Sequence, residues 1–281
     1  MEKIKEKVVI LYDGGDCSDG FGGAWTAWKK FGNGAKYIGV FHQSPIPEGL
    51  NNKIIYMIDF TYPEEITRKL IKDNITVTSI DHHVSVLKAI KLTKNYSYSE
   101  NNSGSVLAWK YFFPKKPIPK LLKYIEDMDL WVNKLPYSKE IFAYHNLFGF
   151  EFKTWNKLAT ELENSGKFKK WAEIGKILLR YEDKLIDFLI KNNTEKAVFD
   201  GYKVAVVNSP LFHSQICNRV LNKEIKVGIA WRKKQDKIYV SLRSDGRADV
   251  AKLAKKYGGG GHKTSSGFEV KNNKLPWKTI K

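Results

Sequence analysis

Apolar runs rich in β-branched residues alternate with amphipathic stretches through the first third of the chain. The runs have the length of buried strands and cover residues 8–12, 35–41, 53–58 and 75–80. The stretches between them, residues 21–31 and 63–73, are typical of helices: glycines end the first, and a proline with two acids begins the second. Alternating strands and helices predict a mainly parallel sheet with right-handed crossovers.

The remainder of the chain predicts a helical stretch and then a second α/β unit. A short strand is expected within residues 91–99, followed by a helix that Ser103 or Ser105 begins and Pro114 ends. Residues 117–126 predict a further helix, and residues 137–193 are helical in pattern. From about Lys196 we expect strands, a hairpin and two short helices. The α/β fold is thus predicted in three parts: an N-terminal domain 1–135, a helical connector 136–195 and a smaller domain 196–281.

Acidic residues and histidines follow the predicted strands. The first strand runs into Asp13-Gly14-Gly15-Asp16-Cys17-Ser18-Asp19-Gly20, the third into Asp59, and the fourth into Asp81-His82-His83. Open parallel sheets place their ligand crevice at this carboxyl edge, and crowded carboxylates need a metal, a proton or solvent to relieve their repulsion. We therefore predict a metal site here, with helix capping as the alternative role for Asp59. Asp127 and Asp129 lie at the C-terminal end of a predicted helix. Acids there oppose the helix dipole, so two of them suggest a functional role.

A glycine-rich segment near the C-terminus predicts an anion or nucleotide cradle. Gly258-Gly259-Gly260-Gly261-His262-Lys263-Thr264-Ser265-Ser266 supplies free backbone N–H groups, an imidazole, an ammonium and hydroxyls. Arg243, shortly before it, can clamp a phosphate with two hydrogen bonds.

Charge and cysteine content narrow the class of partner and compartment. The chain carries 48 Lys and Arg against 30 Asp and Glu, a formal net charge of +18. This excess favours a polyanionic partner such as nucleic acid or a nucleotide, although a Lys-rich solubilising surface gives the same number. Two distant cysteines argue against a disulfide framework, and no apolar stretch reaches membrane-spanning length. We expect a cytoplasmic protein with no membrane partner.

The motifs together resemble those of the DHH phosphoesterase family. Residues 13–20, Asp59 in Ile-Asp-Phe-Thr-Tyr-Pro, the Asp81-His82-His83 triplet and residues 126–131 are similar to its four motifs, in the same order. Ser241-Leu242-Arg243-Ser244 and the Gly-Gly-Gly-Gly-His segment resemble the DHH-associated C-terminal domain. One difference stands out, because the family usually has histidine where this chain has Asp13.

The resemblance implies a dinuclear centre, usually with two Mn²⁺ ions and with Mg²⁺ as the alternative. Asp13, Asp16 and Asp59 would hold one ion, and Asp19, Asp59, His82 and Asp127 the other. His83 would face the substrate phosphate as a catalytic residue, with Asp81 orienting its neighbours. The implied substrate-binding residues are Arg243, Gly260, Gly261 and His262, and we add Ser105 to them. The role of Asp129 is left open.

The implied activity is metal-assisted phosphoester hydrolysis. Three hypotheses for the function of the protein remain open. The first is a Mn²⁺-dependent exonuclease that shortens oligonucleotides, which the positive charge and the aromatic content of 13% favour. The second is a phosphodiesterase or phosphatase of small nucleotides, such as a cyclic dinucleotide, its linear product or a 3′,5′-bisphosphate nucleoside. The third is a nucleic-acid binder that has lost catalysis, which only Asp13 supports. A homodimer is compatible with each.

Overall fold

The computed structural model describes residues 7–15, 17–41, 44–271 and 274–280 of the chain. These residues divide into two compact units, Met1–Leu179 and Arg180–Lys281. Each unit contains its own sheet, so the mixed α/β architecture expected from the sequence is confirmed.

Unit 1 is built on a five-stranded sheet in which every strand pair is parallel. The spatial order is β2-β1-β3-β4-β5. The strands are β1 (Val8–Asp13), β2 (Ala35–Val40), β3 (Ile54–Ile58), β4 (Thr76–Asp81) and β5 (Asn95–Tyr98). The four apolar runs seen in the sequence thus form four of these strands, because buried parallel strands need side chains that are apolar on both faces.

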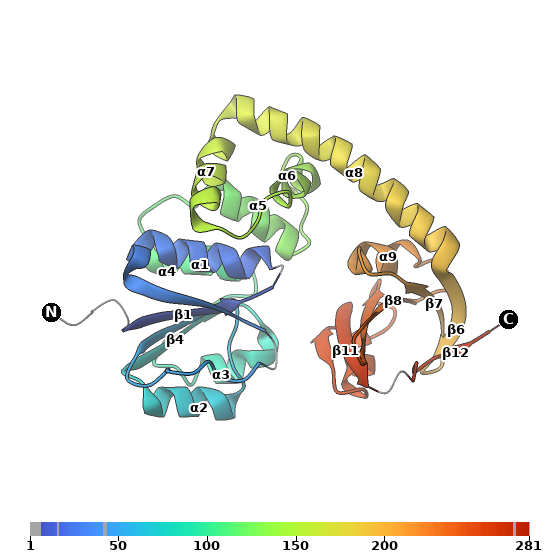
Figure 1. Ribbon diagram of the computed structural model, residues 1–281, viewed down its shortest axis with the longest axis horizontal. Coiled ribbons are helices and arrows are strands. Elements are labelled where there is room, and N and C mark those ends of the chain that lie inside the picture. The colour runs from blue at the N-terminus through green and yellow to red at the C-terminus, as the bar shows by residue number, and fades with distance from the viewer. Residues whose placement is uncertain (1–6, 16, 42–43, 272–273, 281) are drawn as a thin grey trace. The chain divides into compact units, whose positions relative to one another are not determined.

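Helices cover both faces of this sheet. In Figure 1, α1 (Ser18–Phe31) and α4 (Gly104–Phe112) lie over one face, and α2 (Glu64–Asp73) and α3 (Leu87–Ile90) lie over the other. Successive side chains of a strand point to opposite faces. On β1, Ile10 packs with Ala27 and Ala108 of the first pair of helices, whereas Leu11 belongs to the cluster on the opposite face.

Strand register brings the acidic strand ends to one edge. Tyr12 pairs with Ile58, and Ile58 pairs with Ile80. Asp13, Asp59 and Asp81 each come directly after one of these residues, so they lie at the same carboxyl edge. Strands β1 and β3 are neighbours although β2 lies between them in the chain, and such a switch in strand order opens a crevice for ligands.

A helical layer completes unit 1. Besides two short 3₁₀ turns, Gly32–Gly34 and Val84–Val86, the chain forms α5 (Lys120–Asp129), α6 (Ser138–His145), α7 (Phe152–Glu163) and the first half of α8 (Ser165–Asn193). Trp155 of α7 is fully buried and packs with α1 and α8 through Phe21 and Trp171. The helical pattern of residues 137–193 therefore appears in the structure as three helices, of which α8 is the longest.

Unit 2 contains a seven-stranded mixed sheet. Its spatial order is β10-β11-β9-β8-β7-β6-β12, and only β7 and β8 pair in parallel. The strands are β6 (Thr194–Phe199), β7 (Tyr202–Asn208), β8 (Val227–Lys234), β9 (Lys237–Ser244), β10 (Gly260–His262), β11 (Ser265–Lys271) and β12 (Lys278–Thr279). Two short helices, α9 (His213–Arg219) and α10 (Val250–Lys255), complete it.

Part of the glycine-rich segment forms a strand, which the sequence analysis did not predict. Gly260, Gly261 and His262 form a short strand antiparallel to β11, with Gly261 paired to Ser266. Gly261 has a φ of +132°, and a Cβ atom there would lie 2.6 Å from the carbonyl oxygen of Ser265. Only glycine fits this backbone. The strand therefore requires glycine at this position, although glycine has a low strand propensity in general.

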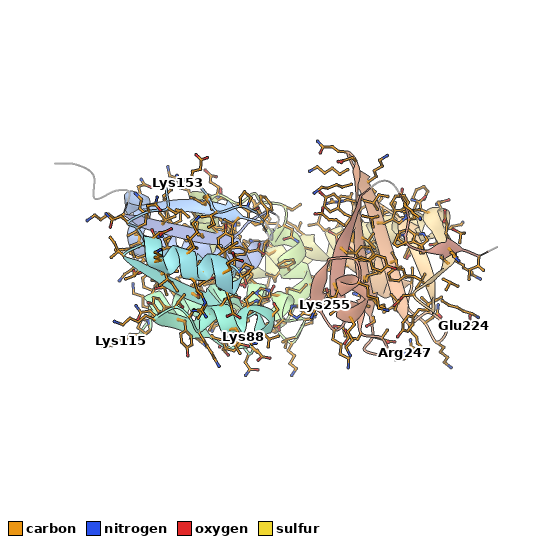
Figure 2. All side chains as sticks on the ribbon, turned by 90° about the horizontal axis from the view of Figure 1, so that it is seen from below. Lys88, Lys115, Lys153, Glu224, Arg247 and Lys255 are labelled. Atoms are coloured by element: carbon orange, nitrogen blue, oxygen red, sulfur yellow. The ribbon has the colours of Figure 1, made fainter. Side chains whose placement is uncertain are left out.

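Positive side chains are distributed over separate elements. In unit 1, Lys88 of α3, Lys115 after α4 and Lys153 of α7 are all exposed, as Figure 2 shows. Lys255 and Arg247 are exposed in unit 2.

Across the described part of the chain, no helix has the length and apolar character needed to cross a membrane.

Replacing Trp155 with alanine should strongly destabilise unit 1. Its ring centroid lies 5.0 Å from that of Phe21 and 4.8 Å from that of His145. Removing a fully buried aromatic side chain costs about 3–5 kcal/mol. We expect urea unfolding, followed by circular dichroism, to show this loss. Phe188→Ala, where the ring is 64% exposed, is the control and should change stability little. Equal losses in both variants would contradict this packing.

Candidate functional site

Asp59 lies at the centre of the acidic edge in an unusual backbone conformation. It directly follows β3, has a φ of +56° and is only 4% exposed. Its N–H donates to the carbonyl oxygen of Ile80 at 2.9 Å, which ties it to β4. The first residue of α4, Gly104, packs directly against it, and a Cβ atom on Gly104 would lie 2.5 Å from the Asp59 Cβ. Glycine at 104 therefore allows the N-terminus of α4 to approach this carboxylate.

Asp13 and Asp19 approach from β1 and α1. A Cβ atom on Gly20 would lie 2.1 Å from the carbonyl oxygen of Asp13, so the first turn of α1 packs directly on the end of β1. Asp19 lies in that turn and is 2% exposed. Its Oδ1 accepts a hydrogen bond from the N–H of Ser105 at 3.1 Å. Its buried Oδ2 has no hydrogen-bond partner among the described residues.

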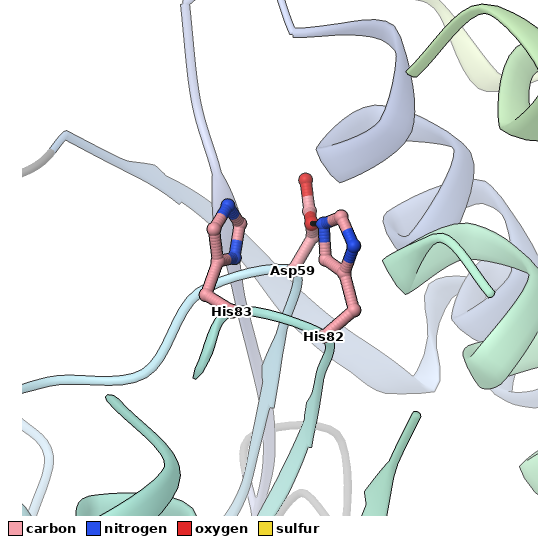
Figure 3. A group of neighbouring side chains, drawn as sticks. All are labelled: Asp59, His82 and His83. Carbon is pink, nitrogen blue, oxygen red and sulfur yellow. Dashed lines mark ion pairs between the residues drawn. The ribbon is translucent and has the colours of Figure 1, made fainter. Parts of the chain in front are cut away.

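The Asp81-His82-His83 triplet places its three side chains in different positions. Asp81 is fully buried, and its Oδ1 accepts from the backbone N–H of His83 at 3.0 Å and lies 2.8 Å from the His83 Nδ1. His82 extends to the other side, with Nε2 3.2 Å from Asp59 Oδ1 (Figure 3) and 3.6 Å from Asp129 Oδ2. Asp81 thus orients His83, whereas His82 points into the acidic cluster.

Cys17 also lies in this cluster, although the sequence analysis did not include it among the ligands. It is the N-cap residue of α1, and its Sγ accepts from the N–H of Gly20 at 3.3 Å. The same Sγ lies 3.5 Å from Asp59 Oδ2 as a donor. Its position between Asp13 and Asp19 in the sequence was the available signal.

These side chains form three overlapping groups, in each of which the ligand atoms lie within 4.8 Å of one another. The groups are Asp13 with Cys17 and Asp59; Asp59 with His82 and His83; and Asp19 with His82 and Asp129. Asp59 and His82 each belong to two groups. Because the groups overlap, this edge offers more than one candidate position for a divalent ion.

Burial and mutual repulsion make negative charge on the acidic groups of the cluster unfavourable. Burial, and then the nearby Asp19 and Cys17, raise the pKa of Asp59 well above its usual value. Burial and Asp19 raise the pKa of Asp129 to about 8, and burial with Asp13 and Asp19 raises that of Cys17 to about 12. The N-termini of α1 and α4 lie at the cluster and offset part of this charge. Divalent cations would offset the rest.

Asp81 and His83 behave as a coupled pair of opposite charge. Burial raises the pKa of Asp81, but the hydrogen bonds and charge of His83 outweigh it, so the net shift is downward. Burial lowers the pKa of His83, but the bond to Asp81 outweighs it and the net shift is upward. Each group therefore favours the charged form of the other.

Asp127 lies outside the cluster, contrary to the expected ligand set. Its Oδ1 accepts from the N–H of Lys134 at 3.0 Å, and its Oδ2 accepts from the N–H of Leu135 at 3.2 Å and from the Ser138 hydroxyl. Both oxygens thus fix the loop between α5 and α6. Asp129, two residues further along α5, reaches His82 instead.

Ser105 is also placed differently from the sequence expectation, which assigned it to substrate binding. It is fully buried, and its backbone N–H holds Asp19 while its hydroxyl lies 3.1 Å from that of Ser103. Glu126 of α5 fixes the same turn by accepting from the N–H of Ser103 at 2.9 Å. Ser105 therefore positions a candidate ligand. Asp16, the remaining expected ligand, lies outside the described residues.

In unit 2, Arg243 is held by neighbours that the sequence analysis did not identify. Its Nη1 donates to the carbonyl oxygen of Leu242 at 2.9 Å, and its Nη2 donates to the Ser214 hydroxyl at 2.5 Å. His213 lies beside it, with Nε2 2.6 Å from the carbonyl oxygen of Ser209 and Nδ1 3.1 Å from the Ser241 hydroxyl. A carbonyl only accepts, so Nε2 carries the proton. Strand β9, which bears Arg243, is joined to the Gly260–His262 strand through β11.

Comparison with known proteins agrees with this architecture. Residues 200–277 match the DHHA1 domain. The uncharacterized protein R106 of Acanthamoeba polyphaga mimivirus is 30% identical over an alignment of 303 residues. The alignment covers 98% of this chain and 71% of that protein.

Two solved structures share the fold at low identity. An exopolyphosphatase-related protein from Bacteroides fragilis is 15% identical, with a TM-score of 0.51, over 97% of this chain and 89% of that one. RecJ from Thermus thermophilus, solved in complex with Mn²⁺, is 15% identical, with a TM-score of 0.52, over 94% of this chain and 49% of that one. This chain thus spans about half the length of RecJ.

A parallel sheet with acids and imidazoles at its carboxyl edge, followed by a DHHA1 domain, defines a phosphoesterase of the metal-dependent hydrolase class. The chain belongs to the DHH phosphoesterase family.

Gly104→Ala should displace Asp59 and weaken divalent-metal binding. The added Cβ would meet the backbone and Cβ of Asp59 below 3.0 Å, so one of the two must move. We expect at least about a tenfold loss of Mn²⁺ affinity, the lower end of what outer-sphere changes cost metal sites, measured by isothermal titration calorimetry. Gly149→Ala, where the added Cβ has nothing within 4 Å, is the control. Unchanged Mn²⁺ affinity in Gly104→Ala would contradict this packing.

Asp127→Ala and Asp129→Ala should separate stability from metal binding. Loss of the Asp127 carboxylate leaves two backbone N–H groups and a hydroxyl without their acceptor, which should cost roughly 2–4 kcal/mol of folding free energy. Asp129→Ala should instead reduce metal affinity and leave the unfolding midpoint of the metal-free protein nearly unchanged or raised. Urea unfolding and metal titration on both variants measure this. The reverse pattern would assign Asp127 to the metal centre.

Proposed function

We propose that this protein is a divalent-metal-dependent phosphodiesterase that hydrolyses short single-stranded oligonucleotides from an end, with Mn²⁺ as the physiological ion. The proposal assigns catalysis to residues 1–135, a connecting role to residues 136–195 and substrate binding to residues 196–281. Mg²⁺ is the alternative ion.

The observation that carries the proposal is the convergence of ligand atoms on Asp59 and His82. Asp59 shares groups with Asp13 of β1 and with His82, and His82 shares a further group with Asp19 of α1 and Asp129 of α5. The buried Asp19 Oδ2 has no hydrogen-bond partner among the described residues, and the buried Asp59 Oδ1 has only the ion-pair contact with His82. Buried polar atoms are ordinarily satisfied, so these oxygens suit binding of a cation. Carboxylates with one or two imidazoles suit Mn²⁺.

The metals and the protein would divide the chemistry between them. Two divalent ions, when bound, supply an activated water and positive charge opposite the phosphate oxygens. We assign Asp13 and Asp59 to one position, together with Asp16, and Asp19, His82 and Asp129 to the other. Asp129 replaces Asp127 in this assignment because its carboxylate is the one that reaches His82.

His83 is the residue that would contact the scissile phosphate. Its Nδ1 donates to Asp81 Oδ1 across 2.8 Å, and the side chain is 34% exposed. The hydrogen bond and charge of Asp81 raise the pKa of His83, which favours the protonated imidazole. A proton on Nε2 can donate a hydrogen bond to a phosphate oxygen or protonate the leaving oxygen. Asp81 acts through His83 as a positioning residue.

Unit 2 would supply recognition of a terminal phosphate. Arg243 is pinned at two of its nitrogens, and its buried Nε has no hydrogen-bond partner among the described residues. Gly260, Gly261 and His262 are exposed on β10. A pre-oriented guanidinium and a strand of exposed glycines suit a phosphate group.

Charge favours an oligonucleotide over a small nucleotide as the substrate. The formal net charge is +18, and exposed lysines such as Lys88, Lys153 and Lys255 lie on separate elements. Such a surface attracts a polyanion by many weak contacts. A small-nucleotide phosphodiesterase or phosphatase uses the same centre and is the second outcome of the test below. A nucleic-acid binder without catalysis is the third.

The test is hydrolysis of end-labelled RNA and DNA oligomers of graded length with Mn²⁺. We expect stepwise shortening by the wild-type protein, lost by roughly 10³-fold or more in Asp59→Asn and His82→Ala, because removal of central catalytic groups typically costs this much. A cyclic dinucleotide and a 3′,5′-bisphosphate nucleoside are assayed in parallel. Cleavage of only these small compounds would move the substrate assignment from oligonucleotides to small nucleotides.

A matched control separates loss of chemistry from loss of fold. His145→Gln alters a buried histidine that lies against Trp155 in the helical layer and outside the cluster. It should keep its hydrolytic rate at temperatures where the protein is folded. Tight binding of oligomers with no turnover by the wild-type protein would favour the binder and end the hydrolase proposal.

A further inference from the structure

The Cys17 sulfur lies among the candidate metal-ligand atoms at the carboxyl edge of the sheet. Its Sγ lies 3.5 Å from Asp59 Oδ2 and within 4.8 Å of ligand atoms of both Asp13 and Asp59. The residue is partly accessible, and it precedes the helix turn that carries Asp19. The thiol and the two carboxylates together form one group of potential metal ligands.

Helix capping alone does not explain a cysteine here. The Sγ does accept a hydrogen bond from the N–H of Gly20 at 3.3 Å. Ser, Thr, Asp and Asn are the strongly preferred N-cap residues, because their oxygen atoms are better acceptors than sulfur. What sulfur offers over oxygen at this position is its affinity for soft metal ions.

The second cysteine shows what a structural thiol looks like in the same chain. Cys217 is fully buried in unit 2 and packs among Ile216, Val220 and Ala230. Its Sγ donates to the carbonyl oxygen of Ser241 at 3.4 Å. It has no place in any of the three ligand groups found among the described residues. Cys217 is therefore a natural control for Cys17.

We propose that Cys17 binds metal through its sulfur together with Asp13 and Asp59, and that this position prefers a thiophilic divalent ion such as Zn²⁺ or Co²⁺. The inference rests on the proposed function, because it concerns the same centre. Binding breaks the S–H bond, the proton leaves to solvent, and the thiolate electron pair forms the metal–sulfur bond, so no redox partner is needed.

The two metal positions would then differ in preference. Asp19, His82 and Asp129 offer oxygen and imidazole donors, which suit Mn²⁺, whereas thiolate donors select softer ions. The centre would hold a mixed pair of ions, with Cys17, Asp13 and Asp59 at the position that prefers the softer ion. This chain would thereby depart from an all-Mn²⁺ centre at the position where it also carries Asp13.

Cobalt titration of the metal-free, full-length protein tests the inference. Co²⁺ bound to a thiolate gives a strong near-ultraviolet charge-transfer band that carboxylate and imidazole ligands do not give. We expect the band in the wild-type protein, saturating at one Co²⁺ per chain, and its loss in Cys17→Ser. Cys217→Ala should retain it. Co²⁺ binding by the wild-type protein without the band, or a band that persists in Cys17→Ser, would overturn the assignment.

Competition between ions gives a second measurement. Changes to outer partners of metal ligands already cost roughly 10–100-fold in affinity, so loss of a direct ligand in Cys17→Ser should weaken Zn²⁺ binding by at least tenfold. Mn²⁺ binding should change much less. Cys17→Asp, which keeps a capping oxygen and supplies a hard ligand, should shift the preference from Zn²⁺ toward Mn²⁺. Equal Zn²⁺ and Mn²⁺ preferences in all three proteins would count against the inference.

Failure of this inference and failure of the proposed function give different results. Mn²⁺-dependent hydrolysis without a thiolate band would reject Cys17 as a ligand and leave the phosphodiesterase standing. A thiolate band without hydrolysis of any substrate would reject the enzyme and leave the ligand assignment. Circular dichroism of Cys17→Ser confirms its fold, which serine should preserve because it is a good N-cap residue.

Discussion

The arrangement of unit 1 depends on the repulsion between carboxylates that the sheet forces together. Parallel strands with matched ends bring Asp13 and Asp59 to one edge, and α1 and α5 add Asp19 and Asp129. In water such a cluster would disperse, but here Asp19 and Asp59 are almost fully buried. The chain must therefore spend packing energy to hold these side chains, and bound cations recover the electrostatic cost.

Much of the surrounding structure serves to hold that cluster in place. Gly104 brings a helix N-terminus against Asp59, and Glu126 fixes the turn just before it. Asp127 ties down the loop that follows Asp129. Acids that resemble ligands in the sequence thus divide into those that face the centre and those that support it, and only the three-dimensional contacts distinguish the two roles.

The sequence predicted the fold well because its signals are local and strong. Runs such as Ile75–Ile80 can be read from composition, and residues that end parallel strands must share an edge. The choice between Asp127 and Asp129 depends on how the C-terminal turn of α5 is rotated, which periodicity does not determine. Cys17 was passed over because cysteine is a weak capping group and no pattern of paired thiols marked it. The strand at Gly260 was unexpected because glycine has low strand propensity.

Helix α8 gives the chain a boundary that differs from the one its domain motif marks. The DHHA1 match begins at residue 200, yet Ile186, Leu189 and Ile190 near the end of α8 pack on Ala205 and Val207 of β7. Arg219 also pairs with Asp183 and Asp187 of the same helix. A fragment cut at the motif boundary would expose an apolar strip on one face of its sheet. A C-terminal fragment that keeps these contacts therefore starts inside the helix, and a recombination event that exchanged this domain with its contacts intact would have to carry those turns with it.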